Sequence, residues 1–229
     1  MALTPFRLRV YHDHIVDGGQ ATLLSERRVI YCVAGDARVT GDGRTVSLRE
    51  DEGLFSDREI NVHAGSEGAC LWRWELVQLN NGPGEIRRDG IKSTSAGDYK
   101  IELDISIKRL MRLDRVGFPL GGEALTHIHA APGVRCQLTG SLLLDSLGIR
   151  HRVWPGDTWV EHGPDRVYAK ASEVYLSSFV RVMIVPEAYK GKSTITYVRP
   201  EDADKPKSQS YKRYLEEPIS LQGFAHRGV

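Results

Sequence analysis

The chain has 229 residues, of which 41% are hydrophobic and 27% are charged, and its formal net charge is +1 at pH 7. This balance is typical of a globular protein with one or two domains, and the absence of a basic excess argues against bulk attraction to nucleic acid. No segment approaches the roughly 20 apolar residues of a membrane-spanning helix, so we expect no membrane partner.

Three widely spaced cysteines, Cys32, Cys70 and Cys136, lie within apolar runs that resemble strands. An odd, scattered set of this kind indicates reduced, buried thiols instead of a disulfide framework. The N-terminal residues also lack the basic-then-apolar pattern of a secretory signal. We therefore expect a cytoplasmic protein.

Residues 7–78 have the pattern of short strands separated by turns. Apolar runs at residues 29–33 and 70–76 flank Asp42-Gly43, a dipeptide typical of β-hairpins. Residues 31–37 resemble residues 135–141, and both stretches run into a glycine-containing turn and a second strand. We interpret this similarity as an internal duplication, with two small β-barrels in one chain.

Changes in composition predict the domain boundaries. Residues 1–79 are expected to form the N-terminal barrel, and residues 80–98, rich in Gly, Asn, Ser and charge, the linker. The second barrel is expected over residues 99–190, where apolar and polar residues alternate at its start. Residues 191–229 are too polar for a core of their own, so this tail should pack on its own barrel or on a partner subunit.

The second barrel contains a pair of histidines, His127 and His129, on one short predicted strand. Side chains at i and i+2 of a strand project from the same face. Two imidazoles that face the interior of a curled sheet are a natural beginning for a divalent metal site.

This stretch resembles the two sequence motifs of the cupin family. The first motif is matched by two glycines and the histidine pair, namely Gly121, His127, His129 and Gly140, while Gly133 stands where the family has a glutamate. The second is matched by Pro155-Gly156-Asp157 and Gly163, with Glu161 in place of a proline and Arg166 in place of the last histidine. The resemblance implies an all-β chain with two tandem cupin (double-stranded β-helix, jelly-roll) barrels and, by default, a homodimer.

The first barrel has its own H-x-H sequence, His12 and His14. This pair lies about twenty residues before Gly35, whereas His129 lies about ten residues before Gly140. The offset puts the first pair on an earlier strand, so we expect a surface or structural role for it.

A workable metal site needs a third ligand beside His127 and His129. Glu161, next to the Pro-Gly-Asp turn, could complete a two-His-one-carboxylate triad for Fe(II), Mn(II), Ni(II) or Zn(II). Its neighbour His162 would then face the opposite way. Alternatively, Glu161 caps a turn and the two histidines only form hydrogen bonds inside the barrel.

Two arginines, Arg135 and Arg166, occupy positions that the resemblance directs into the barrel, and alternation directs Gln137 inward too. A buried guanidinium without a partner is costly, so either a protein carboxylate or an anionic ligand should pair with it. Aromatic residues would supply apolar walls, or else belong to the core; they are Trp154, Trp159 and Tyr168.

Two hypotheses follow. In the first, the second barrel is a metal-dependent enzyme for a small, carboxylate-bearing molecule, with dioxygenase chemistry favoured over decarboxylase, isomerase or lyase chemistry. Its catalytic residues would be Arg135, Glu161 and Arg166, and substrate would contact Arg135, Gln137, Trp159, Arg166 and Tyr168. In the second, the protein is a non-catalytic, ligand-binding bicupin that has lost the full metal triad.

Overall fold

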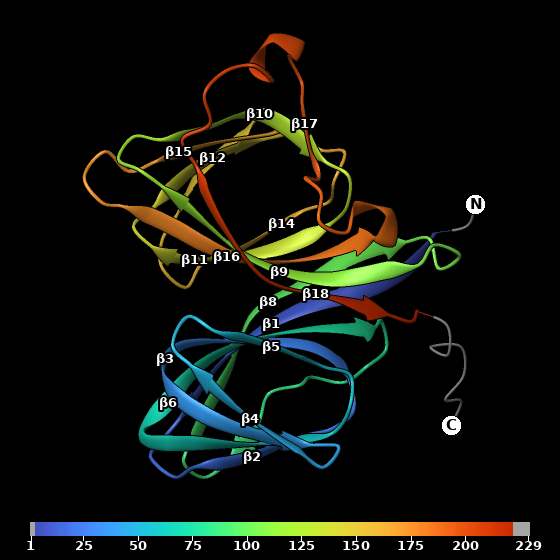
Figure 1. The fold of residues 1–229 in the computed structure, drawn as a ribbon, viewed down its shortest axis with the longest axis vertical. Coiled ribbons are helices and arrows are strands. Elements are labelled where there is room, and N and C mark those ends of the chain that lie inside the picture. Colours follow the sequence, from blue (N-terminus) through green and yellow to red (C-terminus); the bar gives the residue numbers. More distant parts are fainter. Residues whose placement is uncertain (1–2, 222–229) are drawn as a thin grey trace. The chain divides into compact units, whose positions relative to one another are not determined.

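The computed structural model describes residues 3–221, which divide into two compact units, residues 3–105 and 106–221. Both units are built from antiparallel β-strands, and the helices in the described residues are two short 3-10 turns (Figure 1). No helix in this part of the chain is long and apolar enough to cross a membrane.

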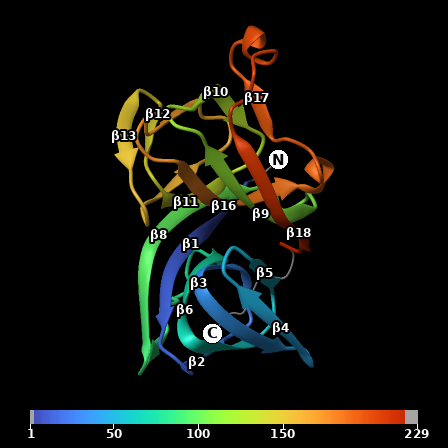
Figure 2. The same ribbon diagram turned by 60° about the vertical axis from the view of Figure 1, so that its left-hand side comes forward.

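The first unit contains one eight-stranded sheet, which curls around an interior (Figure 2). Its central order is β4-β3-β6-β1-β8-β7, with β2 paired to β6 and β5 paired to β3. The strands are β1 (Thr4–Ile15), β2 (Gln20–Leu23), β3 (Arg27–Gly41), β4 (Arg44–Arg49), β5 (Gly53–Ser56), β6 (Ile60–Gln78), β7 (Arg87–Arg88) and β8 (Ile91–Leu103).

The strands of this unit differ from the short segments that the sequence pattern predicts. β8 begins inside the segment 80–98 that we expected to be a linker, and it pairs with β1 along almost its whole length. Residues 91–98 are polar because one face of this strand is exposed, which gives it the composition of a linker. The compact unit consequently extends to Ile105.

The second unit is a sandwich of two five-stranded sheets, which Figure 1 shows as two layers. One sheet has the order β13-β12-β15-β10-β17 and the other β14-β11-β16-β9-β18. The elements are β9 (Arg109–Phe118), β10 (Glu123–His129), β11 (Gly133–Thr139), β12 (Leu142–Ser146), β13 (Ile149–Val153), β14 (Thr158–Glu161), β15 (Val167–Ala171), β16 (Ser177–Pro186), η1 (Glu187–Tyr189), β17 (Ile195–Tyr197), η2 (Pro200–Asp202) and β18 (Ser210–Ile219).

Alternation along β16 explains how a polar site lies inside this sandwich. Phe179 belongs to one buried apolar cluster, and Met183 and Val185 belong to another. Arg181 lies between them at the same period of two, so it faces the same interior. A belt of charged and polar side chains thus separates two apolar clusters along the sandwich.

The segment after residue 190 completes both sheets of the second unit. β17 pairs with β10, and β18 pairs with β9. The described part of the predicted tail therefore packs on its own sandwich, and residues 222–229 of that prediction lie outside the described residues.

Two glycines in the stretches 31–37 and 135–141 share a backbone conformation, while the internal duplication stays a prediction from the sequence. Gly35 on β3 and Gly140 after β11 have positive φ angles of 73° and 63°. A Cβ atom on Gly140 would lie 2.5 Å from the carbonyl oxygen of Leu176, and one on Gly35 would collide with the carbonyl oxygen of Gly68. Each glycine thus allows a close approach of the neighbouring backbone.

Candidate metal centre

The two histidines of the H-x-H sequence lie on β10, between β15 and β17. Both imidazoles are buried, with exposed fractions of 6% for His127 and 5% for His129. Their Nε2 atoms are 3.3 Å apart. The i and i+2 positions of the strand therefore bring both rings to one point of the interior.

The hydrogen bonds of the two Nδ1 atoms bear on which tautomer each histidine adopts. His127 Nδ1 lies 2.7 Å from the carbonyl oxygen of Leu125, so this nitrogen carries a proton and donates it. His129 Nδ1 lies 3.1 Å from the hydroxyl of Thr194, which also lies 3.9 Å from the sulfur of Met183. His127 Nε2 is then left with a lone pair, and so is His129 Nε2 when the Thr194 hydroxyl accepts from Nδ1.

Burial keeps both imidazoles neutral. It lowers the pKa of His127, and it lowers the pKa of His129 to about 3 despite the opposing effect of the Glu161 carboxylate. Neutral imidazole is the form that binds a metal ion.

Glu161 on β14 brings a carboxylate to the same point. Its Oε1 accepts a hydrogen bond of 3.0 Å from Trp159 Nε1, while its Oε2 lies 3.2 Å from His129 Nε2. Burial alone would raise the pKa of Glu161, but the Arg135 guanidinium and the adjacent imidazoles lower it well below the usual range. The carboxylate is therefore ionised.

Glu161 lies opposite the glycine of the first cupin-like motif. Gly133 on β11 is the direct cross-strand partner of Glu161 on β14. Directly opposed residues in an antiparallel pair have neighbouring side-chain positions. The Glu161 carboxylate thus lies on the strand next to position 133.

The three side chains fit a divalent cation. One ligand atom from each of His127, His129 and Glu161 lies within 4.8 Å of the other two. Two neutral nitrogens and an ionised oxygen form a two-His-one-carboxylate set. Glu161 Oε2 is buried and makes no hydrogen bond with any described residue, so a cation would give this oxygen a ligand bond in place of the missing hydrogen bond.

Two buried arginines add positive charge beside this set. Arg135 Nη2 lies 2.6 Å from Glu161 Oε2 in an ion pair whose angles are not those of a hydrogen bond. Burial lowers the pKa of Arg135 to about 10, so it stays charged at neutral pH. Arg181 shares Asp114 with Arg213, each through a contact of 3.2 Å. Arg213 also contacts Glu216 at 3.3 Å, so each of these three guanidinium groups has a carboxylate partner.

The set borders a cavity of about 30 Å³. That volume holds an ion with roughly one or two water molecules, and it is far below the roughly 300–1,000 Å³ of most organic ligand sites. The C-terminal segment contributes Ile195, Tyr197, Gln209 and Tyr211 to the lining. A larger ligand therefore requires these residues to move.

The structure separates the predicted site residues into two groups. Arg135, Trp159 and Glu161 line the cavity with the two histidines. Arg166 is exposed and Tyr168 is half-buried, and both line a groove elsewhere on the unit. Placing Arg166 in the barrel interior was wrong, because Val167, Ala169 and Ala171 are the inward residues of β15.

Two further expectations about side chains also differ from the structure. Gln137 is buried, but its amide donates to the carbonyl oxygen of Thr139 beside a register shift, and it does not line the cavity. Trp154 is 53% exposed, so it is no wall of the interior. His162 is exposed next to the buried Glu161, as the alternation of a strand predicts.

Sequence reasoning missed the residues that come from the closing strands and the C-terminal segment. Arg181 and Tyr211 line the cavity, and Thr194 orients His129. The signal for Arg181 was present, since it is one charged residue on the inward side of an otherwise apolar strand. Thr194 and Tyr211 lie in polar stretches whose pairing partners are distant in sequence, so no local pattern marks them.

The H-x-H sequence of the first unit does not assemble a comparable set within the described residues. His14 is exposed, and the His12 ring stacks on Trp72 with centroids 5.2 Å apart. These environments are those of surface and packing residues.

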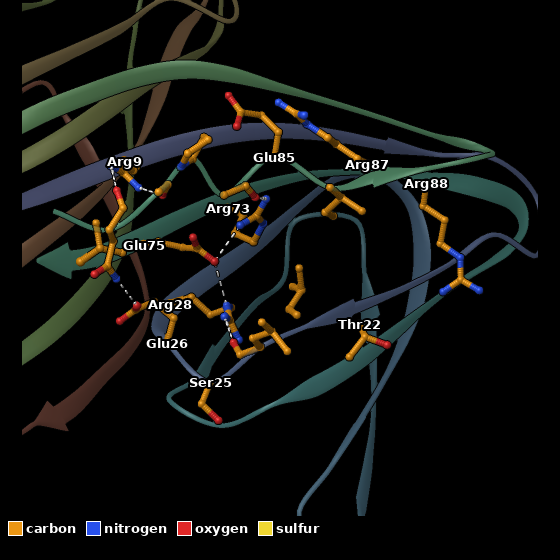
Figure 3. A pocket seen from close by; sticks show the side chains of 18 of the residues that line it. Arg9, Thr22, Ser25, Glu26, Arg28, Arg73, Glu75, Glu85, Arg87 and Arg88 are labelled. Atoms are coloured by element: carbon orange, nitrogen blue, oxygen red, sulfur yellow. Dashed lines mark hydrogen bonds and ion pairs between the residues drawn. The ribbon is translucent and has the colours of Figure 1, made fainter. Parts of the chain in front are cut away.

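The first unit contains a larger pocket, of about 810 Å³, with an ionic network at its base (Figure 3). Arg28 and Arg73 both contact Glu75, and Arg73 also binds Asp13 at 2.7 Å. Arg9 donates to the carbonyl oxygens of residues 81 and 82, and Arg73 to that of residue 84. The network thus ties the wall formed by residues 80–88 to the sheet.

Comparison with known proteins shows the fold. No family model and no curated sequence matches the chain. A mutant of Bacillus subtilis oxalate decarboxylase is similar in structure, with a TM-score of 0.62 and 13% identity over 87% of this chain and 73% of that one. Lactobacillus farciminis oxalate decarboxylase in a formate complex has a TM-score of 0.60 and 11% identity, over 86% of this chain and 82% of that one. AerE from Microcystis aeruginosa has a TM-score of 0.57 and 11% identity, over 79% of this chain and 87% of that one. The chain has the all-β cupin jelly-roll fold, which confirms the fold class predicted from its sequence.

Proposed function

We propose that the second unit is a metal-dependent enzyme that acts on a small carboxylate-bearing molecule, with a dioxygenase-type oxidation as its reaction. The convergence of His127, His129 and Glu161 carries this proposal. A two-His-one-carboxylate set with open positions is characteristic of non-haem Fe(II) oxygenases. Fe(II), Mn(II), Ni(II) or Zn(II) bound there would supply Lewis acidity and, for the redox-active ions, electron transfer to oxygen.

The chain's own residues would hold the reactants. Thr194 and the Leu125 carbonyl orient the two imidazoles, and Trp159 fixes the Glu161 carboxylate. Arg135 and Arg181 would offer guanidinium groups to a substrate carboxylate. Tyr197, Gln209 and Tyr211 would exclude bulk water while substrate is bound. The oxalate decarboxylases among the structural neighbours act on a small dicarboxylate, which supports this substrate class.

A second candidate function is ligand binding without catalysis. The Arg135–Glu161 ion pair favours it, because the guanidinium already neutralises the carboxylate that would bind a metal. In this case the interior would bind a small anion at Arg135 or Arg181, and no metal would be needed.

A homodimer and a cytoplasmic location remain predictions from the sequence.

Turnover by metal-loaded protein distinguishes the two functions. Protein loaded anaerobically with each of the four metals is offered a panel of small carboxylic acids, while oxygen consumption and CO₂ release are recorded. We expect one metal to support oxygen consumption with at least one acid, and His129→Ala to reduce the rate at least about 100-fold. His162→Ala, on the opposite face, should keep the activity. Thermal stabilisation by acids with no turnover under any metal would contradict the enzyme and favour the second candidate.

A further inference from the structure

Arg135 is the buried side chain closest to the carboxylate of the candidate metal centre. Its side chain has no exposed surface. Nη1 donates a hydrogen bond of 2.5 Å to the carbonyl oxygen of Gly133, and Nη2 lies 2.6 Å from Glu161 Oε2. Nε and Nη2 make no hydrogen bond with any described residue. The guanidinium is therefore held mainly by its electrostatic attraction to the Glu161 carboxylate.

Gly133 provides the space that this guanidinium occupies. A Cβ atom on Gly133 would lie 3.1 Å from Arg135 Nη1 and 2.7 Å from Met183 Cγ. Any side chain at position 133 would thus displace both neighbours. The glycine and the arginine two residues later form one arrangement, in which a fixed positive charge fills the place beside the two histidines.

Oε2 is the oxygen of Glu161 that makes no hydrogen bond with any described residue. Oε1 accepts the indole N–H of Trp159 at 3.0 Å. Oε2 faces both His129 Nε2, at 3.2 Å, and Arg135 Nη2, at 2.6 Å. A metal ion bound by the histidines and Oε2 would therefore share this oxygen with the guanidinium, and two cations at such a short separation in a buried site repel each other strongly.

We propose that Arg135 is an internal cation that competes with the metal ion for Glu161 Oε2. This inference rests on the proposed metal centre and adds a regulatory element to it. Without metal, the guanidinium neutralises the buried carboxylate. When a metal ion binds, the guanidinium is released from Oε2 and becomes an unpaired positive charge in the cavity. Metal binding then creates the anchor for a substrate carboxylate, so metal and anion bind cooperatively.

The competition makes a prediction about metal affinity that a merely structural role of Arg135 does not make. Removing the guanidinium eliminates a competitor and a repelling charge, so metal should bind more tightly. We expect Arg135→Met and Arg135→Gln to lower the Kd for Zn(II) and Mn(II) at least about tenfold, which corresponds to 1.4 kcal/mol. A residue that only supported the architecture would leave the Kd unchanged or raise it.

The experiment is isothermal titration of chelator-treated full-length protein with Zn(II) and with Mn(II). Arg181→Met is the matched control, because it removes a second cavity arginine whose partner is Asp114 and not Glu161. The Kd of Arg181→Met for each metal should stay within about threefold of the wild-type value, because this variant loses a nearby positive charge but no competitor for Glu161 Oε2. Circular dichroism checks the fold of each variant, and the glutamine variant keeps a donor for the Gly133 carbonyl if methionine is not tolerated.

The outcomes separate this inference from the proposed function. Tighter metal binding by both Arg135 variants than by wild type supports the competition. Metal binding by the variants alone, with none by wild type, also supports the competition, but it would overturn the proposed metalloenzyme. Equal affinities in wild type and the Arg135 variants overturn the competition and leave the metal centre standing. If no protein binds metal, both are overturned.

Discussion

Replacement of Arg73 by methionine is expected to destabilise the first unit by about 3–5 kcal/mol. Arg73 is 1% exposed, binds Asp13 through Nε at 2.7 Å and contacts Glu75 through Nη1 at 2.6 Å. Methionine would leave these carboxylates with too little positive charge in a buried site. It would also remove the hydrogen bond that ties residue 84 to the sheet.

Urea unfolding followed by tryptophan fluorescence measures this effect. Trp72 and Trp74 lie in the first unit and Trp154 and Trp159 in the second, so a Trp154→Phe, Trp159→Phe background reports on the first unit alone. Arg87→Met is the control, because Arg87 lines the same pocket but is exposed (Figure 3), and it should change stability by less than about 0.5 kcal/mol. Equal unfolding midpoints for both variants would refute the importance of the network.

Glu161→Gln is expected to affect both stability and metal binding. The isosteric amide leaves the buried Arg135 guanidinium without its counter-charge, so the metal-free protein should lose about 3–5 kcal/mol. The amide is also a far weaker ligand than a carboxylate, and we expect metal affinity to fall at least about 100-fold.

A double-mutant cycle tests the electrostatic cause of that loss. Glu161→Gln combined with Arg135→Met removes both charges, so the double variant should be more stable than Glu161→Gln alone. Glu173→Gln, at an exposed carboxylate, is the control and should have almost no effect. Losses that simply add up in urea unfolding of the chelated protein would contradict the paired-charge account.

The sequence predicted the fold well because the cupin-like motifs and strand alternation are local signals. Alternation was less informative where a strand is half-exposed. β8 has a polar first half and was taken for a linker, although it pairs with β1. The apolar run at residues 29–33 suggested a short strand, yet β3 continues to Gly41 through two register shifts.

The candidate site was predictable where side-chain direction follows from neighbours in sequence. His127 and His129 share a face, and Glu161 and His162 take opposite faces, as a period of two requires. Arg166 was misplaced because it was assigned from a motif position. The small residues Val167, Ala169 and Ala171 already mark the inward side of β15, which leaves Arg166 and Tyr168 outside.

The remaining cavity residues depend on long-range pairing. Tyr197 reaches the cavity because β17 pairs with β10, and Tyr211 because β18 pairs with β9. Both strands belong to a polar segment with little hydrophobic periodicity, and β18 has a register shift between Arg213 and Leu215. No pattern within the segment determines which residues face the cavity.

Metal content is the measurement that tests the central claim most directly. Protein purified without chelator or nickel resin is dialysed against Fe(II), Mn(II) or Zn(II), desalted and examined by elemental analysis. We expect about one metal ion per chain in wild type and in His12→Ala with His14→Ala, and almost none in His127→Ala with His129→Ala. Absence of metal from wild type, or equal metal in all three proteins, would contradict a metal centre at His127, His129 and Glu161.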